Sequence, residues 1–408
     1  MNPAGSESSL ADPVPAPRGD DIAGAAKANV PRRRARFPRT GSLLLALLAR
    51  PWVDRVCLWG LRRLLPASRA WAAAAATGAS RDGFARELGL LGLPMPPLLH
   101  RKLTATHRLR LLAKAAQTRW AEIAFGESEG DLAAAERERR KTAQSYMANR
   151  FRYLLFAKRH RVPAVRYRTP TPEIAIEALS QVLADPDALF QVPDSLPQIQ
   201  RSGGIDHGDA IEYWLRFESG GVADEPADTA YAHVYEPKQH GAAGLPSFFF
   251  AHGLAMELEM MADGPRSFLG MARVGMRIVL PDGPGHNRRC KAGLYGGESF
   301  LTEPPVSGIL HFVRAAREYA ALIAWCRAQG PGRISLGGIS LGALTAQVAA
   351  SRWRYWPAEA KPDALFLMTT TARISALPLE SSLGQVADID NEVRRRGWTL
   401  EHFAALES

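Results

Sequence analysis

The run Gly338–Gly342 (Gly-Ile-Ser-Leu-Gly) has the residue types and spacing of a turn that presents a nucleophilic serine. It follows an expected strand and opens an expected helix that continues from Ala343 to about Trp353. A strand-to-helix turn this tight forces Ser340 into a strained backbone conformation, and the small residues Gly338 and Gly342 relieve the crowding. The turn lifts the Ser340 hydroxyl above the sheet edge and aims the Leu341 N–H at any anion that forms there. The run therefore predicts a nucleophilic serine at position 340.

Two further motifs follow apolar strands upstream. His252-Gly253-Leu254 closes the strand 247–251, and Asp282-Gly283-Pro284-Gly285-His286 follows the strand 276–280. With the Ser340 run, they resemble the α/β-hydrolase fold of esterases, lipases and related acyl-transfer enzymes over roughly 205–372.

The resemblance implies a role for each motif. The Leu254 N–H would be the second oxyanion donor beside that of Leu341, after the oxyanion loop that His252 and Gly253 open. The turn with Asp282, Gly283 and Gly285 would be structural. His286 would not be the base, because the family takes its histidine from a later strand.

The triad is where the sequence departs from the family's pattern. The family order is serine, then acid, then histidine, and His402 is the only histidine after Ser340. His402 would be the base only in an unusual placement, and without a base Ser340 is a poor nucleophile. The candidate acids are Glu380, Asp388, Asp390, Glu392 and Glu401. One strand (364–368) is readable after the run, so we expect a C-terminally incomplete sheet with an exposed apolar edge, most simply as a fragment.

Strands and helices alternate along the second half of the chain. We expect strands at 210–217, 230–235, 247–251, 276–280, 333–336 and 364–368, and a helix at 308–328. Apolar strands that alternate with helices indicate an α/β, α/β-hydrolase-like, mainly parallel sheet with an N-terminal α-helical region. The expected parts are a disordered tail (1–40), a basic helical extension (41–170), a linker (171–205) and the truncated α/β-hydrolase-like domain (206–408).

The 408 residues carry a net charge of +10 that is unevenly placed. Residues 1–170 hold 31 Lys and Arg against 13 Asp and Glu, whereas residues 171–408 carry an acidic excess. An anionic membrane surface is one candidate partner, and a solvated arginine-rich helical surface is the alternative. The apolar run 43–49 is too short to span a bilayer, and the amphipathic stretch 53–64 favours a helix packed on its own protein over one in contact with a membrane.

The composition excludes other classes. The three cysteines are scattered without a Cys-x-x-Cys pair, so we expect neither a disulfide scaffold nor a metal site, and we expect a cytoplasmic protein, peripheral to a membrane if it binds one. No nucleotide, cofactor or nucleic-acid motif is present, and the sequence leaves the oligomeric state open.

Three functions remain open. The first is a serine hydrolase of a small-molecule or lipid-like acyl ester. The second is a hydrolase fold without a complete triad that serves as a scaffold. The third is a membrane-surface protein that acts through its basic N-terminal half.

Overall fold

The computed structural model describes residues 51–192, 195–222, 226–239, 244–256, 264–371, 373 and 375–407. The expected tail 1–40 and the apolar run 43–49 lie outside the described residues. Contacts group Arg55–Ser408 into one unit, and the description below concerns that unit.

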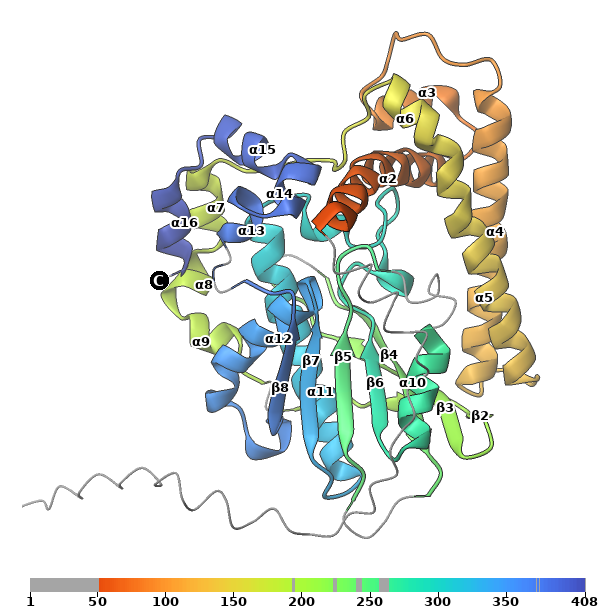
Figure 1. Ribbon diagram of the computed structural model, residues 1–408, viewed down its shortest axis with the longest axis vertical. Coiled ribbons are helices and arrows are strands. Elements are labelled where there is room, and N and C mark those ends of the chain that lie inside the picture. The colour runs from red at the N-terminus through yellow and green to blue at the C-terminus, as the bar shows by residue number, and fades with distance from the viewer. Residues whose placement is uncertain are drawn as a thin grey trace, which may run out of the picture. The chain divides into compact units, whose positions relative to one another are not determined.

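An eight-stranded mixed sheet runs through the centre of the unit (Figure 1). The strands are β1 (Gln200–Arg201), β2 (Ile205–Asp206), β3 (Ala210–Ser219), β4 (Asp228–Pro237), β5 (Ser247–Ala251), β6 (Arg277–Pro281), β7 (Ile334–Ile339) and β8 (Ala364–Met368). Their order is β1-β3-β4-β6-β5-β7-β8, with β2 paired to β3. Strands β6, β5, β7 and β8 pair in parallel, whereas β1 to β4 pair antiparallel and β4 joins β6 antiparallel. The predicted α/β class and its six expected strands are confirmed.

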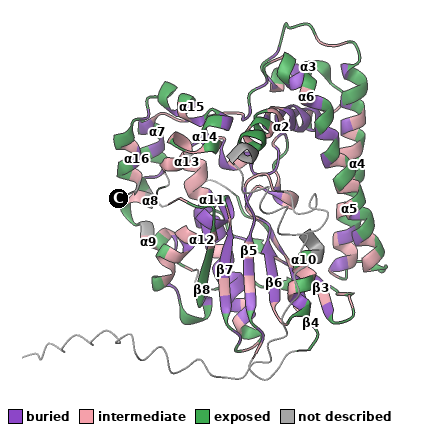
Figure 2. Cartoon of the chain, viewed as in Figure 1, coloured by how far each residue is buried: buried purple, intermediate pink, exposed green. Residues whose placement is uncertain are grey.

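Apolar composition explains which strands form the middle of the sheet. Strand β6 is buried at every position, and β5 and β7 are largely buried, as the purple central strands of Figure 2 show. Strand β8 differs, because Leu365, Phe366 and Met368 are 37%, 50% and 41% exposed. The expectation that the last strand presents an exposed apolar edge is confirmed for the described residues.

Helices cover the sheet and extend beyond it. Helix α12 (Leu341–Arg352) packs on β5, β7 and β8, and α10 (Gly264–Arg273) packs on β4 and β6. The predicted helix 308–328 is confirmed as α11 (Val306–Ala328), which buries fourteen side chains. The helices and 3₁₀ turns of this half are α7 (Pro172–Ala178), α8 (Ser180–Ala184), α9 (Pro186–Leu189), α10 (Gly264–Arg273), η4 (Asn287–Arg289), η5 (Glu298–Phe300), α11 (Val306–Ala328), α12 (Leu341–Arg352), η6 (Trp353–Tyr355), η7 (Ala358–Ala360), α13 (Ala376–Leu379), α14 (Ser382–Ala387), α15 (Ile389–Arg395) and α16 (Leu400–Glu407). Three of these helices lie within the expected linker 171–205, and the domain boundaries stay a prediction.

The basic N-terminal region is helical, as expected. Its elements are α2 (Pro51–Thr77), α3 (Arg81–Glu87), α4 (Leu99–Ala124), α5 (Leu132–Ala148), η2 (Asn149–Tyr153) and α6 (Leu154–Arg159). Asp131 caps α5 by accepting the Ala134 N–H at 3.1 Å. The 3₁₀ turn η2 separates α5 from α6. Among the described residues, no helix is long and apolar enough to cross a bilayer.

The amphipathic stretch in α2 is only partly packed on the protein. Val56 and Cys57 are exposed and Leu61 is 38% exposed, whereas α2 is buried almost continuously from Leu65 to Ala75. The interpretation of this stretch as a packed helix therefore does not hold for its first described turns, whose apolar side chains are exposed.

Arg69 of α2 fastens the helical region to the loop before α11. Its side chain is 1% exposed and donates to Gly293 O at 2.9 Å and to Glu87 Oε1 at 2.8 Å. Its Nε lies 3.4 Å from Oε1 of the buried Glu298, which also accepts the Arg166 N–H. A guanidinium presents five N–H donors in a planar fork that can reach acceptors in several directions, whereas an ammonium presents three donors from one point.

We expect Arg69→Lys to lower the free energy of unfolding by about 1–2 kcal/mol, because part of this buried network loses its donor. Chemical denaturation measures the change. Arg62→Lys on the exposed part of the same helix is the matched control and should stay within about 0.5 kcal/mol of the parent. Equal loss in both variants would show that the network does not anchor α2.

Candidate active site

Ser340 occupies the turn between β7 and α12. Its backbone has φ 54° and ψ −119°, a conformation that a residue with a side chain adopts rarely, and the residue is exposed. The Ser340 N–H donates to Met368 O at 2.9 Å and lies 3.2 Å from Thr369 Oγ1 of the neighbouring strand end. The predicted strand, turn and helix around Ser340 are therefore present with the expected strain.

The two flanking glycines are required by close approach to the neighbouring strand. A Cβ at Gly338 would lie 2.4 Å from Ala251 O, and a Cβ at Gly342 would lie 2.2 Å from the same oxygen. Real Cβ atoms do not approach backbone oxygens so closely, so only glycine fits both positions. The two glycines let the turn between β7 and α12, called the elbow below, pack directly against the end of β5.

The end of β5 brings Gly253 against the serine. A Cβ built on Gly253 would lie 3.3 Å from Ser340 Cβ and 3.4 Å from Ile339 O. Leu254 follows immediately, and Leu341 is the first residue of α12, whose first N–H groups have no acceptor within the helix. The structure thus brings the predicted oxyanion segment and the serine turn together.

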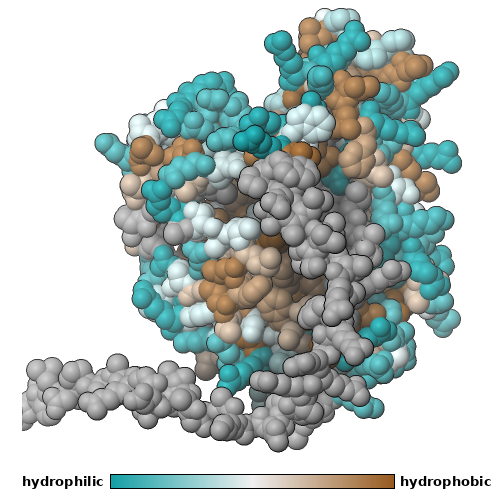
Figure 3. Space-filling view, viewed as in Figure 1, coloured by the Kyte–Doolittle hydropathy of each residue, from teal (hydrophilic) through white to brown (hydrophobic). Residues whose placement is uncertain are grey.

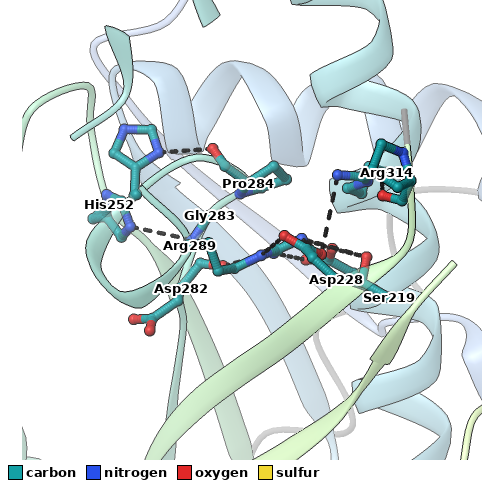
Figure 4. Close-up of polar contacts among 11 residues, drawn as sticks. Ser219, Asp228, His252, Asp282, Gly283, Pro284, Arg289 and Arg314 are labelled. Carbon is teal, nitrogen blue, oxygen red and sulfur yellow. Dashed lines mark hydrogen bonds and ion pairs between the residues drawn. The ribbon is translucent and has the colours of Figure 1, made fainter. Parts of the chain in front are cut away.

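His252 ties this segment to the turn after β6. Its ring is buried, the Gly283 N–H donates to Nε2 at 3.3 Å, and Nδ1 lies 3.0 Å from Gly253 O (Figure 4). Because Nε2 accepts, Nδ1 carries the hydrogen and donates to Gly253 O. His252 therefore holds two backbone segments at a fixed spacing.

The rest of that turn is also held by side chains. Asp282 accepts from Asn287 Nδ2 at 3.0 Å and from Arg288 Nη1 at 2.7 Å, and Gly285 has φ 70°. His286 has its Nδ1 3.0 Å from Pro284 O, and its buried Nε2 faces Gly297, where a Cβ would lie 2.2 Å away. His286 therefore packs against backbone, and no described hydrogen bond joins it to Ser340.

An ion cluster of Arg289, Asp228 and Glu318 supports the turn after β6, and no sequence pattern predicted it. Arg289 donates to Asp228 at 2.7 Å and to Glu318 at 2.7 Å, and it also reaches Asp282 O (Figure 4). Burial alone would lower the pKa of Arg289, but the carboxylates of Glu318 and Asp228 outweigh it and raise the pKa. The cluster joins β4 and α11 to the turn that carries His286. Its members are far apart along the chain, so no local pattern marked them.

Three histidines lie near one another beneath the site. The His252 and His286 ring centroids are 4.8 Å apart, and those of His286 and His311 are 6.2 Å apart. Burial lowers the pKa of all three, to about 3 for His311 and well below the usual value for His286. All three are therefore neutral in the folded protein near pH 7.

This cluster predicts acid sensitivity. The folded pKa values lie below the ordinary 6.5, so the stabilisation is complete above pH 6.5 and is lost as the pH falls towards the folded values. Between about pH 7.5 and about pH 5.5, His286 and His311 together cost about 3 kcal/mol of unfolding free energy, and the lowered pKa of His252 adds to this loss. Burial raises the pKa of Glu298 to about 7, which opposes this loss and returns about 2 kcal/mol.

We therefore expect the unfolding free energy to fall by about 1–2 kcal/mol over that interval, as denaturant titrations at each pH would measure. His311→Gln removes one titrating group and should flatten the pH dependence by about 1 kcal/mol. A parent protein equally stable at both pH values would contradict the assignment of neutral buried histidines.

His402 contacts residues at the start of its own helix, α16. Its Nδ1 accepts the Thr399 N–H at 3.1 Å, and its ring meets the Trp398 ring edge-on at 5.9 Å between centroids. These contacts cap the start of α16, and no hydrogen bond of the described residues joins His402 to Ser340. Most of the candidate acids are paired within their own segment: Glu380 with Arg373, Asp388 with Asn391, Asp390 with Arg394, and Glu392 with Arg395.

The comparisons with known proteins give one family match and several structural likenesses. Residues 306–370, from the start of α11 past the elbow and β8, match the family described as alpha/beta hydrolase domain containing 18. No curated protein sequence matches the chain.

The similar solved structures include two acetyl xylan esterases. The one from Paenibacillus sp. R4 is 16% identical, with a TM-score of 0.38 over 60% of this chain and 74% of that one. The one from Thermoanaerobacterium sp. JW/SL YS485 is 15% identical, with a TM-score of 0.35 over the same shares. An S-formylglutathione hydrolase from Agrobacterium tumefaciens is 15% identical, with a TM-score of 0.32 over 48% of this chain and 70% of that one.

The parallel strands β6-β5-β7-β8, the strained serine between β7 and α12, and the family match across that turn agree with one another. The chain has an α/β fold, and its part around Ser340 resembles an α/β-hydrolase domain.

Proposed function

We propose that the chain is a serine hydrolase of carboxylic (acyl) esters, with Ser340 as nucleophile and the Leu254 and Leu341 N–H groups as the oxyanion hole. The observation that carries the proposal is the strained, exposed Ser340 at the carboxyl end of β7, whose Cβ lies only 3.3 Å from the place that a Cβ on Gly253 would take. Strain of this kind costs about 1–3 kcal/mol and persists where function needs it.

In the proposed reaction Ser340 Oγ bonds to the ester carbonyl carbon, and the carbonyl oxygen takes the negative charge. The Leu254 and Leu341 amides stabilise that charge, and loss of one such donor typically raises the barrier by about 3 kcal/mol. A base takes the Oγ proton and passes it to the departing alcohol. Water then hydrolyses the acyl-enzyme to the free acid.

The identity of the base stays a prediction. The contacts of His402 are structural, so this residue would serve only after a rearrangement of α16. This leaves the scaffold hypothesis as the competing function, since an unassisted serine hydroxyl keeps an ordinary alcohol pKa.

A fluorophosphonate probe tests the proposal, because it labels only activated serines. The parent should be labelled and Ser340→Ala should not. Ser351→Ala, at the exposed far end of the same helix, is the matched control and should be labelled like the parent. A folded parent that takes no label would overturn the proposal and support the scaffold.

We further propose that the ester substrate is lipid-like. This proposal is supported by the basic charge of the N-terminal half and by the exposed apolar side chains there. Hydrolysis of short soluble esters with no hydrolysis of dispersed phospholipid would rule out the lipid-like substrate and leave the esterase proposal in place.

A further inference from the structure

Two segments at one end of the helical region expose large apolar side chains. One is the loop 88–98 between α3 and α4, and the other is η2 with α6. The exposed side chains are Leu91 (58%), Leu93 (50%), Leu98 (58%), Phe151 (50%) and Leu155 (81%). Single exposed leucines are ordinary, but five in two neighbouring segments need a physical reason.

Both segments are attached to α3, which places them side by side. Arg81 of α3 donates to Pro97 O of the loop at 2.8 Å. Phe84 of the same helix packs on Phe156 of α6, with 5.3 Å between ring centroids. The two segments lie together at the top of Figure 1. In the same view, Figure 3 shows hydrophobic (brown) and hydrophilic (teal) residues side by side at the upper right.

The loop holds its apolar side chains outward on an ordered backbone. The Leu90 N–H donates to Ala85 O at 2.7 Å, and the Leu93 N–H donates to Leu90 O at 3.2 Å. Phe84, Leu88 and Leu90 fill the core beneath. The buried residues fix the loop, so Leu91 and Leu93 cannot turn inward without breaking this packing.

The charge around these side chains has one predominant sign. The sequence has no Asp or Glu between Glu87 and Glu122, nor between Glu138 and Glu173. Exposed cations in and beside the two segments are Arg101, Lys102, Arg152, Lys158, Arg159 and Arg161. On α3, Asp82 is exposed beside the exposed Arg81 and Arg86. The surface therefore combines apolar tips with a basic surround.

We propose that this surface, formed by the loop 88–98 and by η2–α6, docks the protein on a bilayer that contains anionic lipid. Leucine and phenylalanine side chains enter the interface between headgroups and acyl chains, while the surrounding Lys and Arg side chains stay at the level of the anionic headgroups. The attraction of those cations acts within a Debye length and weakens with salt. The inference is independent of Ser340 and of the esterase proposal.

Vesicle sedimentation with the full chain tests the docking surface. The vesicles are phosphatidylcholine alone or phosphatidylcholine with phosphatidylglycerol in equal parts. The parent should bind the anionic vesicles at least tenfold more strongly than the neutral ones, and added salt should weaken this binding.

Two sets of substitutions separate the surface from general basic charge, since residues 1–50 alone carry eight Lys and Arg. Leu91→Ser/Leu93→Ser/Leu155→Ser should lower the anionic-vesicle partition coefficient at least tenfold without changing the net charge. Val274→Ser/Tyr355→Ser removes apolar side chains that are 80% and 50% exposed elsewhere, and it should bind like the parent.

Three results would overturn the proposal. They are parent-like binding by the triple variant, equal binding of the parent to neutral and anionic vesicles, and no binding by the parent. Ser340→Ala should bind vesicles like the parent, and the triple variant should keep its fluorophosphonate labelling. A failure of docking and a failure of the esterase proposal are therefore told apart by these two readouts.

Discussion

Ser340→Ala should remove hydrolysis of a short-chain nitrophenyl ester by at least about 10³-fold, because no other group replaces the nucleophile. Initial rates with purified protein measure the loss. The structure adds a stability expectation that depends on the residue placed at this position. With φ 54° and ψ −119°, the backbone strains any residue that has a Cβ, so alanine keeps the strain and glycine relieves it.

Ser340→Gly should therefore be equally inactive but more stable than Ser340→Ala by about 1 kcal/mol, as denaturant unfolding would show. A glycine variant that is more stable than the alanine variant, while both lose activity, distinguishes a site under functional strain from an ordinary turn. Hydrolysis retained by both variants would end the assignment of Ser340. A less stable glycine variant would contradict the strain argument while leaving the assignment in place.

The local part of the site was predictable from the sequence because its geometry is set within a few residues. The run Gly338–Gly342 encodes a strand end, a tight turn and a helix start, and no distant residue is needed to specify them. The contact with Gly253 was predictable by a similar argument, since the carboxyl ends of neighbouring parallel strands meet at one sheet edge.

The ion cluster that supports the turn after β6 was not predictable, because its residues are distant from one another in the chain. Arg289 meets Asp228 and Glu318 from 61 and 29 residues away, and no periodicity records such pairing. The antiparallel pairing of β3 with β4 was also missed, since strands buried on both faces favoured a parallel sheet.

The basic N-terminal half shows the limit of reading charge alone. Arg69 and Arg139 contribute to the positive sum, yet both side chains are buried in ion pairs with glutamates. Arg152 and Lys158 contribute to the same sum and are exposed. The sequence could not separate these classes, because burial depends on how the helices pack. Only the exposed class is able to meet a membrane.

Gly342→Val should prevent folding to a soluble protein or lower the Tm by at least about 5 °C, because two branches would be added where even a Cβ does not fit. That Cβ would lie 2.2 Å from Ala251 O and 2.6 Å from His252 O. Both oxygens belong to the backbone, so relief requires moving the end of β5 away from α12. Expression yield, circular dichroism and thermal unfolding measure the outcome.

Gly270→Val is the matched control, because Gly270 lies in α10 and a Cβ there would have no heavy atom within 4 Å. Valine and glycine differ by only a few tenths of a kcal/mol in helix propensity, so this variant should fold like the parent. A soluble Gly342→Val protein with the parent Tm would mean that β5 and α12 are not in contact. Since the same contact holds Gly253 against Ser340, that result would also remove the geometric basis of the proposed oxyanion hole.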